Sequence, residues 1–91
     1  MGEPAARLED VHACPMHGGG TIDSPGCPTV LIGGDPVACM DDLAPCFGPP
    51  NTILKGSETV LIGRRPAARI GDPTAHGGKI VSGCLSVLIG G

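Results

Sequence analysis

The sequence has almost no aromatic residues: its 91 residues include one phenylalanine, Phe47, and no tryptophan or tyrosine. Aliphatic side chains therefore have to supply nearly all of the apolar burial, and a chain of this length is marginal for such a core. Small domains of this kind usually need reinforcement by a metal ion, disulfides or a partner. We therefore expect one domain with a reinforcement of this type.

Further absences exclude other classes of protein. No apolar run reaches about 18 residues, so no transmembrane helix is predicted. The six basic residues form no dense patch and the net charge is −3, which argues against nucleic-acid binding. The N-terminus has no cationic start and no apolar core, so we expect synthesis in the cytoplasm without a signal peptide. Five cysteines are an odd number, and a reducing compartment favours thiols or metal ligands over bridges.

The sequence does contain a threefold repeat of about 30 residues, and repeats of this length indicate supersecondary units that cannot stand alone. An apolar tract, a proline-led motif and an aspartate each recur in the same order. The tracts are Val30-Leu31-Ile32, Val60-Leu61-Ile62 and Val87-Leu88-Ile89; the motifs are Pro4-Ala5-Ala6-Arg7, Pro36-Val37-Ala38-Cys39 and Pro66-Ala67-Ala68-Arg69; the aspartates are Asp10, Asp42 and Asp72. We expect a pseudo-threefold molecule whose equivalent loops meet near one axis.

The local structure follows from the turn residues. Each apolar tract is too short for a helix and suits a strand. The links Gly33-Gly34-Asp35-Pro36 and Gly63-Arg64-Arg65-Pro66 are short enough to favour antiparallel hairpins. The repeated aspartates are predicted to form hydrogen bonds within turns rather than to act in catalysis. The predicted fold is all-β, with three pseudo-equivalent short hairpin repeats.

The loops after the aspartates contain all three histidines. Cys14, Cys46 and His76 each stand four residues after an aspartate, and His12 and His17 flank the first of them. Imidazoles and thiolates that converge near an axis are the ligands of a tetrahedral Zn²⁺ site. Repeat register favours Cys14, His17, Cys46 and His76, whereas a second arrangement turns His12 and His17 inward and leaves Cys14 to pack. A third interpretation treats these residues as ordinary polar loop residues and buried thiols.

The remaining cysteines suggest less chemistry. Cys27 and Cys84 occupy matching turn positions, where the middle repeat has Ser57. We expect them to be small buried side chains, with a Cys27–Cys84 bridge after export as the alternative. Cys39 replaces the arginine of the other two motifs, without an evident chemical role.

Signals for an enzyme are weak. The sequence has no G-x-S-x-G elbow, no phosphate-binding loop and no dinucleotide fingerprint. A zinc hydrolase would keep an open coordination position, whereas four protein ligands would close the site and make the metal structural. We therefore expect no enzymatic activity.

The motif combination resembles the PAAR-repeat family over residues 4–91. It consists of Pro-Ala-Ala-Arg, a following aspartate, His76-Gly77-Gly78, and a glycine before Val-Leu-Ile-Gly; the middle repeat departs from it with Val37 and Cys39. The resemblance implies a small three-sided cone with a metal site at its apex, formed by a single PAAR-repeat domain, residues 1–91, without a fused effector domain. Such cones cap the trimeric valine–glycine repeat spike of type VI secretion systems, with a related role in contractile phage-like tails.

The resemblance also implies the site and the partners. A structural Zn²⁺ would be held by His12, His17, His76 and Cys46, with Cys14 as the substitute candidate. The base, formed by the three apolar tracts (residues 30–32, 60–62 and 87–89), would dock one copy onto each spike trimer. Assembly would occur in the cytoplasm, and export by the apparatus would then deliver possible effector proteins through membrane puncture, with transient contact with the target membrane. The alternatives are a generic zinc-binding β-repeat adaptor on another contractile-tail spike and a small zinc hydrolase.

Overall fold

The computed structural model describes residues 2–15, 19–23, 26–45 and 50–90. Within these residues the protein contains short strands and no helix, hence also no helix that could cross a membrane. The strands are β1 (Glu3–Ala5), β2 (Val11–Ala13), β3 (Gly20–Thr21), β4 (Cys27–Ile32), β5 (Asp35–Val37), β6 (Leu61–Ile62), β7 (Arg65–Pro66), β8 (Lys79–Ile80) and β9 (Cys84–Ile89). The prediction of an all-β fold made of short hairpins is confirmed.

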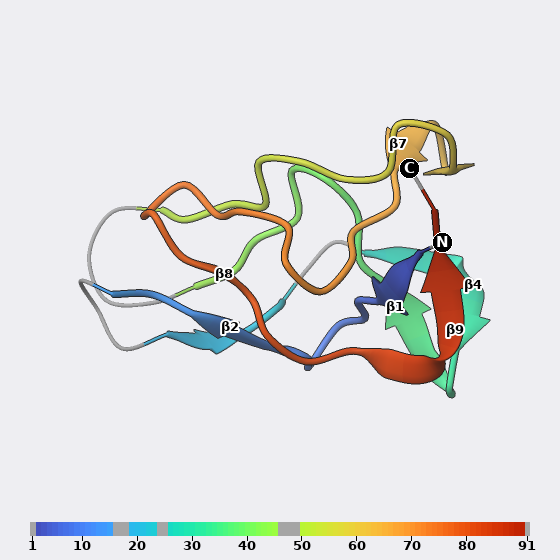
Figure 1. Ribbon diagram of the computed structural model, residues 1–91, viewed down its shortest axis with the longest axis horizontal. Helices are drawn as coiled ribbons and strands as arrows, with labels where there is room; N and C mark the ends of the chain where they lie inside the picture. The colour runs from blue at the N-terminus through green and yellow to red at the C-terminus, as the bar shows by residue number, and fades with distance from the viewer. Residues whose placement is uncertain (1, 16–18, 24–25, 46–49, 91) are drawn as a thin grey trace.

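All strand pairs are antiparallel. Strands β4 and β5 form one hairpin and β6 and β7 another, at the two predicted links. In the third repeat β9 pairs with β1, so that the two chain ends lie beside each other where a third hairpin link would stand (Figure 1). Strand β2 is the middle strand of the order β3-β2-β8 and extends towards the opposite end of the molecule (Figure 1).

Three alanines join the repeats in a closed ring of backbone hydrogen bonds. The N–H of Ala38 donates to the carbonyl of Ala6 at 2.9 Å, the N–H of Ala68 to Ala38 at 2.9 Å, and the N–H of Ala6 to Ala68 at 3.0 Å. All three side chains are fully buried. Three backbones that approach this closely around an axis leave room only for methyl groups, which explains why this position is alanine in every repeat.

A second ring of hydrogen bonds surrounds the first. In each case the residue that follows the proline-led motif donates its N–H to the carbonyl of the motif proline in the next repeat. The bonds, each 2.9 Å long, run from Leu8 to Pro36, from Met40 to Pro66 and from Ile70 to Pro4. Proline suits this position because it acts only as an acceptor and has no N–H to satisfy. The pseudo-threefold arrangement is therefore formed by the backbone.

The core has two parts along the axis. One contains the ring alanines, Ala44, and three isoleucines at equivalent positions, each at most 1% exposed: Ile22, Ile53 and Ile80. The other contains Ala5, Ala67 and Ile89, against which partly buried residues of the apolar tracts pack. Aliphatic side chains thus fill the interior, as the scarcity of aromatic residues predicts.

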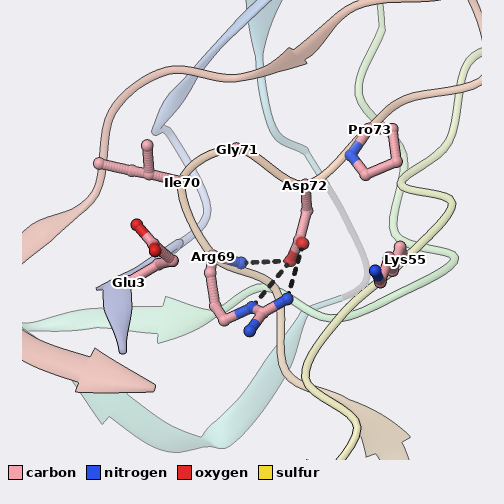
Figure 2. A pocket seen from close by; sticks show the side chains of 7 residues that line it. All are labelled: Glu3, Lys55, Arg69, Ile70, Gly71, Asp72 and Pro73. Atoms are coloured by element: carbon pink, nitrogen blue, oxygen red, sulfur yellow. Dashed lines mark hydrogen bonds and ion pairs between the residues drawn. The ribbon is translucent and has the colours of Figure 1, made fainter. Parts of the chain in front are cut away.

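The repeated aspartates hold their turns as predicted. Oδ2 of Asp72 accepts the N–H of Arg69 at 2.8 Å. The same bond measures 2.7 Å in the other two repeats, from Arg7 to Asp10 and from Cys39 to Asp42. The Arg69 side chain also donates to this carboxylate, through Nε at 3.3 Å and Nη2 at 3.0 Å (Figure 2). Each aspartate therefore closes the turn that follows its motif.

The first repeat has the same arrangement of guanidinium and carboxylate. Arg7 donates to Asp10 through Nε at 2.9 Å and Nη2 at 3.0 Å, and Ser82 of the third repeat donates to Oδ1 at 3.0 Å. Burial alone would raise the pKa of Asp10, but the hydrogen bonds from Arg7 and Ser82 outweigh it, and the pKa lies below its ordinary value. Asp10 therefore stays ionised.

The second repeat obtains its guanidinium from a different position. Cys39 stands where the other repeats have arginine, and Arg65 reaches the aspartate instead: its Nη1 donates to Oδ1 of Asp42 at 2.6 Å. Nη2 of Arg65 also donates to the carbonyl of Gly26 at 3.0 Å. The side chain of Asp42 is completely buried, so that a positive partner is required to offset the cost of burying its charge.

The exchange between the two positions is reciprocal. Arg65 precedes the motif proline of its repeat, where the other two repeats have Asp35 and Glu3. Each of these acidic residues lies near the arginine of a neighbouring motif: Asp35 acts on Arg7 electrostatically, and Glu3 shares a pocket with Arg69. In the second repeat, where Cys39 stands at the motif arginine position, the residue that faces it is Arg65 and not an acidic residue.

We expect the substitution Arg65→Met to destabilise the protein by about 3 kcal/mol, because it leaves a fully buried carboxylate without a positive partner. The measurement is the free energy of unfolding in urea at pH 7. Arg64→Met is the matched control, since Arg64 is exposed and its loss should stay within about 0.5 kcal/mol. Adding Cys39→Arg to Arg65→Met should recover part of the loss, and equal stability of the two single variants would contradict the assignment.

Candidate metal centre

Strand pairing brings two predicted metal ligands together. Cys14 directly follows β2, and His76 lies shortly before β8, which pairs with β2 through Ala13 and Lys79. Sγ of Cys14 lies 3.8 Å from Nδ1 of His76. A tetrahedral zinc ion, with Zn–S of about 2.3 Å and Zn–N of about 2.0–2.1 Å, places the two ligand atoms about 3.5 Å apart. The spacing of this pair therefore fits two ligands of one metal ion.

His12 has the tautomer of a metal ligand. Its Nε2 lies 3.0 Å from the carbonyl oxygen of Pro45, and because a carbonyl only accepts, Nε2 must carry the proton. In the neutral ring Nδ1 then presents a lone pair, and it is buried without a hydrogen-bond partner among the described residues. Metal-bound histidines commonly donate their second ring N–H to a backbone carbonyl in this way. The orphaned Nδ1 of this 1% exposed residue is consistent with a ligand role.

A second orphaned polar atom stands at the equivalent position of the third repeat. Thr74 bonds to Gly78 across its loop as His12 pairs with Gly20, and in the part of the chain that the structure describes its buried Oγ1 has no hydrogen-bond partner either. Ala44 fills the same position in the second repeat and is fully buried. Unsatisfied buried polar atoms are uncommon in folded proteins, so this layer is a candidate place for a bound group.

Two predicted ligands, His17 and Cys46, lie outside the described residues. Among the residues that the structure does describe, no group of three or more potential metal-ligating side chains occurs. The donor chemistry of Cys14, His76 and His12 fits zinc, and the Cys14–His76 pair has the required spacing. The full ligand set remains a prediction.

A glycine contact fixes the distance between the two loops of the pair. Gly78 packs directly against Ala13 and Cys14: a Cβ added at Gly78 would collide with the carbonyl oxygen of Ala13 and lie 3.1 Å from Cα of Cys14. Only glycine allows the third-repeat loop to approach the first repeat this closely. The His76-Gly77-Gly78 sequence thus combines a predicted ligand with the close contact that places it beside Cys14.

The opposite end of the molecule exposes three equivalent leucines. Leu31, Leu61 and Leu88 are 60%, 62% and 61% exposed. The other residues of the predicted base are less open: Ile32, Ile62, Val60 and Val87 pack against the core, Ile89 is buried and Val30 is 37% exposed. The contact surface that the apolar tracts offer is therefore mainly one leucine from each repeat.

Comparison with known families now identifies the chain. The family model described as PAAR motif matches residues 1–46 and, in a second match, residues 15–82. No curated protein matches the chain. The chain belongs to the PAAR family. This is a family of structural spike-tip proteins of type VI secretion systems.

The fold explains the PAAR tetrapeptide residue by residue. Its proline accepts a backbone bond from the neighbouring repeat, its second alanine forms the axial ring, and its arginine pairs with the aspartate of the turn. The first alanine position, Ala5, Val37 or Ala67, is fully buried. Sequence reasoning found the motif but missed the Arg65–Asp42 replacement, although the matched positions already contained that signal.

Cys27 and Cys84 carry free thiols and are partly exposed, so the expectation that both are buried is wrong. They contact different hairpins. Cβ positions built at Gly63 and Gly33 lie 3.4 Å from Sγ of Cys27 and 3.6 Å from Sγ of Cys84. Ser57, at the matching position, donates to the carbonyl of Gly90. Each turn thus contacts the hairpin region of the following repeat. Cys39 is buried, and its pKa is raised to about 11 by that burial, so it is a poor nucleophile at neutral pH.

An open pocket of about 410 Å³ lies between the third-repeat turn and β1 (Figure 2). Two charged groups of this pocket, the guanidinium of Arg69 and the carboxylate of Asp72, form an ion pair with each other. Arg69 also donates through Nη1 to the carbonyl of Gly90 at 3.3 Å. The pocket is lined by Glu3, Lys55, Arg69, Ile70, Gly71, Asp72 and Pro73. This lining contains no serine, cysteine or histidine, and the carboxylate of Asp72 serves the turn.

We expect Gly78→Ala to lower the free energy of unfolding by about 3 kcal/mol, because the added methyl group forces the Cys14 and His76 loops apart. Urea unfolding in the presence of a chelator measures this effect without a metal contribution. The control is Gly34→Ala, where φ is +89° and the space is open, so that only the backbone strain of about 1 kcal/mol applies. A Gly78→Ala variant no less stable than Gly34→Ala would show that the contact is not tight.

Proposed function

We propose that this PAAR protein caps the blunt end of a trimeric valine–glycine repeat spike in a type VI secretion system, with one copy on each trimer. The observation that carries the proposal is the equal exposure of Leu31, Leu61 and Leu88 at one end of the molecule. A ring of apolar side chains open to water is a common mark of a protein interface.

The geometry of the base suits a partner with a true threefold axis. The three leucines occupy equivalent positions of repeats that are themselves joined by closed rings of backbone bonds. A single chain of this kind offers three nearly identical contacts, which three identical subunits can each meet in the same way. An asymmetric partner would have to match the same surface three times with different residues, so symmetry favours a trimer.

We further propose that the apex holds one structural zinc ion, bound by His12, His17, His76 and one cysteine. The 3.8 Å contact between Cys14 and His76 supports Cys14 as the thiolate, and Cys46 is the alternative predicted from the family resemblance. Zinc at four protein ligands would cross-link the loops of different repeats. Such a link would supply the stability that an interior of alanines and isoleucines lacks.

These properties suit a protein that is driven through a membrane. The cone would be assembled on the spike in the cytoplasm, be exported with it, and contact the target membrane only briefly during effector delivery. Rigidity rather than catalysis is the expected requirement, since the repeated aspartates are engaged in turns. We therefore propose a non-enzymatic role.

Single Leu→Asp substitutions at Leu31, Leu61 or Leu88 should weaken binding to a trimeric valine–glycine repeat spike roughly 10- to 100-fold, because each leucine contributes about 1.5–3 kcal/mol when buried. Titration calorimetry against the purified trimer measures the affinity and the expected stoichiometry of one chain per trimer. Leu54→Asp is the matched control, since Leu54 is 54% exposed but lies outside the base. Equal binding by base and control variants would refute the docking surface.

Removal of zinc by a chelator should lower the melting temperature by about 10 °C or more, because a structural zinc contributes several kcal/mol to a domain of this size. His76→Ala should produce the same loss in protein purified with zinc. A comparison of Cys14→Ala with Cys46→Ala identifies the thiolate ligand, since only loss of the ligand removes zinc measured by elemental analysis. Unchanged melting without metal would contradict a structural zinc.

A further inference from the structure

The three contacts between neighbouring loops at the apex are not equivalent. In two of them a glycine meets the backbone of the next repeat: Gly20 packs against the carbonyl of Pro45, and Gly78 packs against Ala13. These glycines stand opposite His12 and Thr74 in their loops. At the matching position of the second repeat, opposite Ala44, the residue is Asn51. At this position the second repeat therefore meets the third through a side chain, beside direct backbone bonds of 2.9 Å from Ala75 to Thr52 and from Leu54 to Pro73.

Asn51 uses both ends of its amide across this contact. Its Oδ1 accepts the backbone N–H of His76 at 2.8 Å, and its Nδ2 donates to the carbonyl of Ala44 at 2.8 Å. The side chain is 1% exposed. Because both bonds are short and shielded from water, the amide has one orientation, and it acts as a fixed spacer between the second-repeat and third-repeat loops.

His76 is consequently held from two sides. Asn51 anchors its backbone to the second repeat, and the close contact of Gly78 anchors the same loop to the first repeat beside Cys14. A hydrogen bond to the backbone N–H of a ligand residue limits where its imidazole can reach. Such outer contacts commonly change metal affinity 10- to 100-fold when they are removed.

We propose that Asn51 is the positioning residue of the metal site, which sets His76 at the distance from Cys14 that one ion requires. The proposal rests on the zinc part of the proposed function and is independent of spike binding. The third-repeat loop is the shortest of the three between its paired residues. The N–H of Ala75 bonds directly to the carbonyl of Thr52 at 2.9 Å, and Asn51 adds the bond that fixes the next residue, His76.

The experiment compares zinc affinity in wild type, Asn51→Ala and Asn51→Gly, by competition with a chromophoric chelator. We expect both variants to bind zinc 10- to 100-fold more weakly and to show a weaker thiolate-to-cobalt charge-transfer band when loaded with Co²⁺. Asn51→Gly introduces the residue that the other two repeats have at this position. It therefore provides the zinc-affinity measurement if the alanine variant does not fold.

Ser57→Ala is the matched control. Ser57 is also a fully buried polar residue of the second repeat that bonds to the third, through Gly90, but at the base. It should lower the stability of the metal-free protein while changing zinc affinity less than twofold. Wild-type zinc affinity in the Asn51 variants, or an equal loss in Ser57→Ala, would overturn the positioning role alone. Absence of zinc binding in wild type would overturn both the positioning role and the proposed zinc site. It would not bear on spike binding, which the leucine variants test.

Discussion

The structure depends on the small closed ring of hydrogen bonds among Ala6, Ala38 and Ala68. Each alanine both donates to and accepts from another repeat, so no repeat completes its backbone bonds alone. The ring also dictates composition. Three segments of the chain that meet within hydrogen-bonding distance of one axis leave room there only for methyl groups, and three equivalent isoleucines pack in the same cluster. A larger side chain at the axis would separate the backbones and break the ring.

Outside this ring the repeats can differ in residue type, provided that the ion pair at each turn is kept. The second repeat has Cys39 in place of the motif arginine, and Arg65 supplies the guanidinium to Asp42 from the position where the other repeats have an acidic residue. A buried carboxylate without a positive partner strongly destabilises the folded protein, so Asp42 needs a guanidinium from one position or another. The requirement thus concerns the charge at the turn rather than the residue at a position of the motif.

The repeat, the hairpins and the turn role of the aspartates could be predicted from the sequence, because each depends on local spacing and on residue types with strong backbone preferences. Register also predicted that Cys14 and His76 are equivalent, and the structure places them in contact. The anchoring of His76 by Asn51 could not be predicted, since it is a side-chain contact between loops of unequal length. The Arg65 exchange could have been found by comparing matched positions for charge.

The unequal loops agree with the proposed metal site, because symmetry and metal coordination make different demands on the chain. Three identical loops would present one kind of ligand three times, whereas a tetrahedral ion takes four. The base has no such conflict, and its three leucines are equally exposed. At the apex the repeats differ at one matched loop position, which is glycine in the first and third repeats and Asn51 in the second. Loops that differ at the end that would bind a metal, together with equivalent leucines at the end that would meet a trimer, are what the two proposed tasks require of one chain.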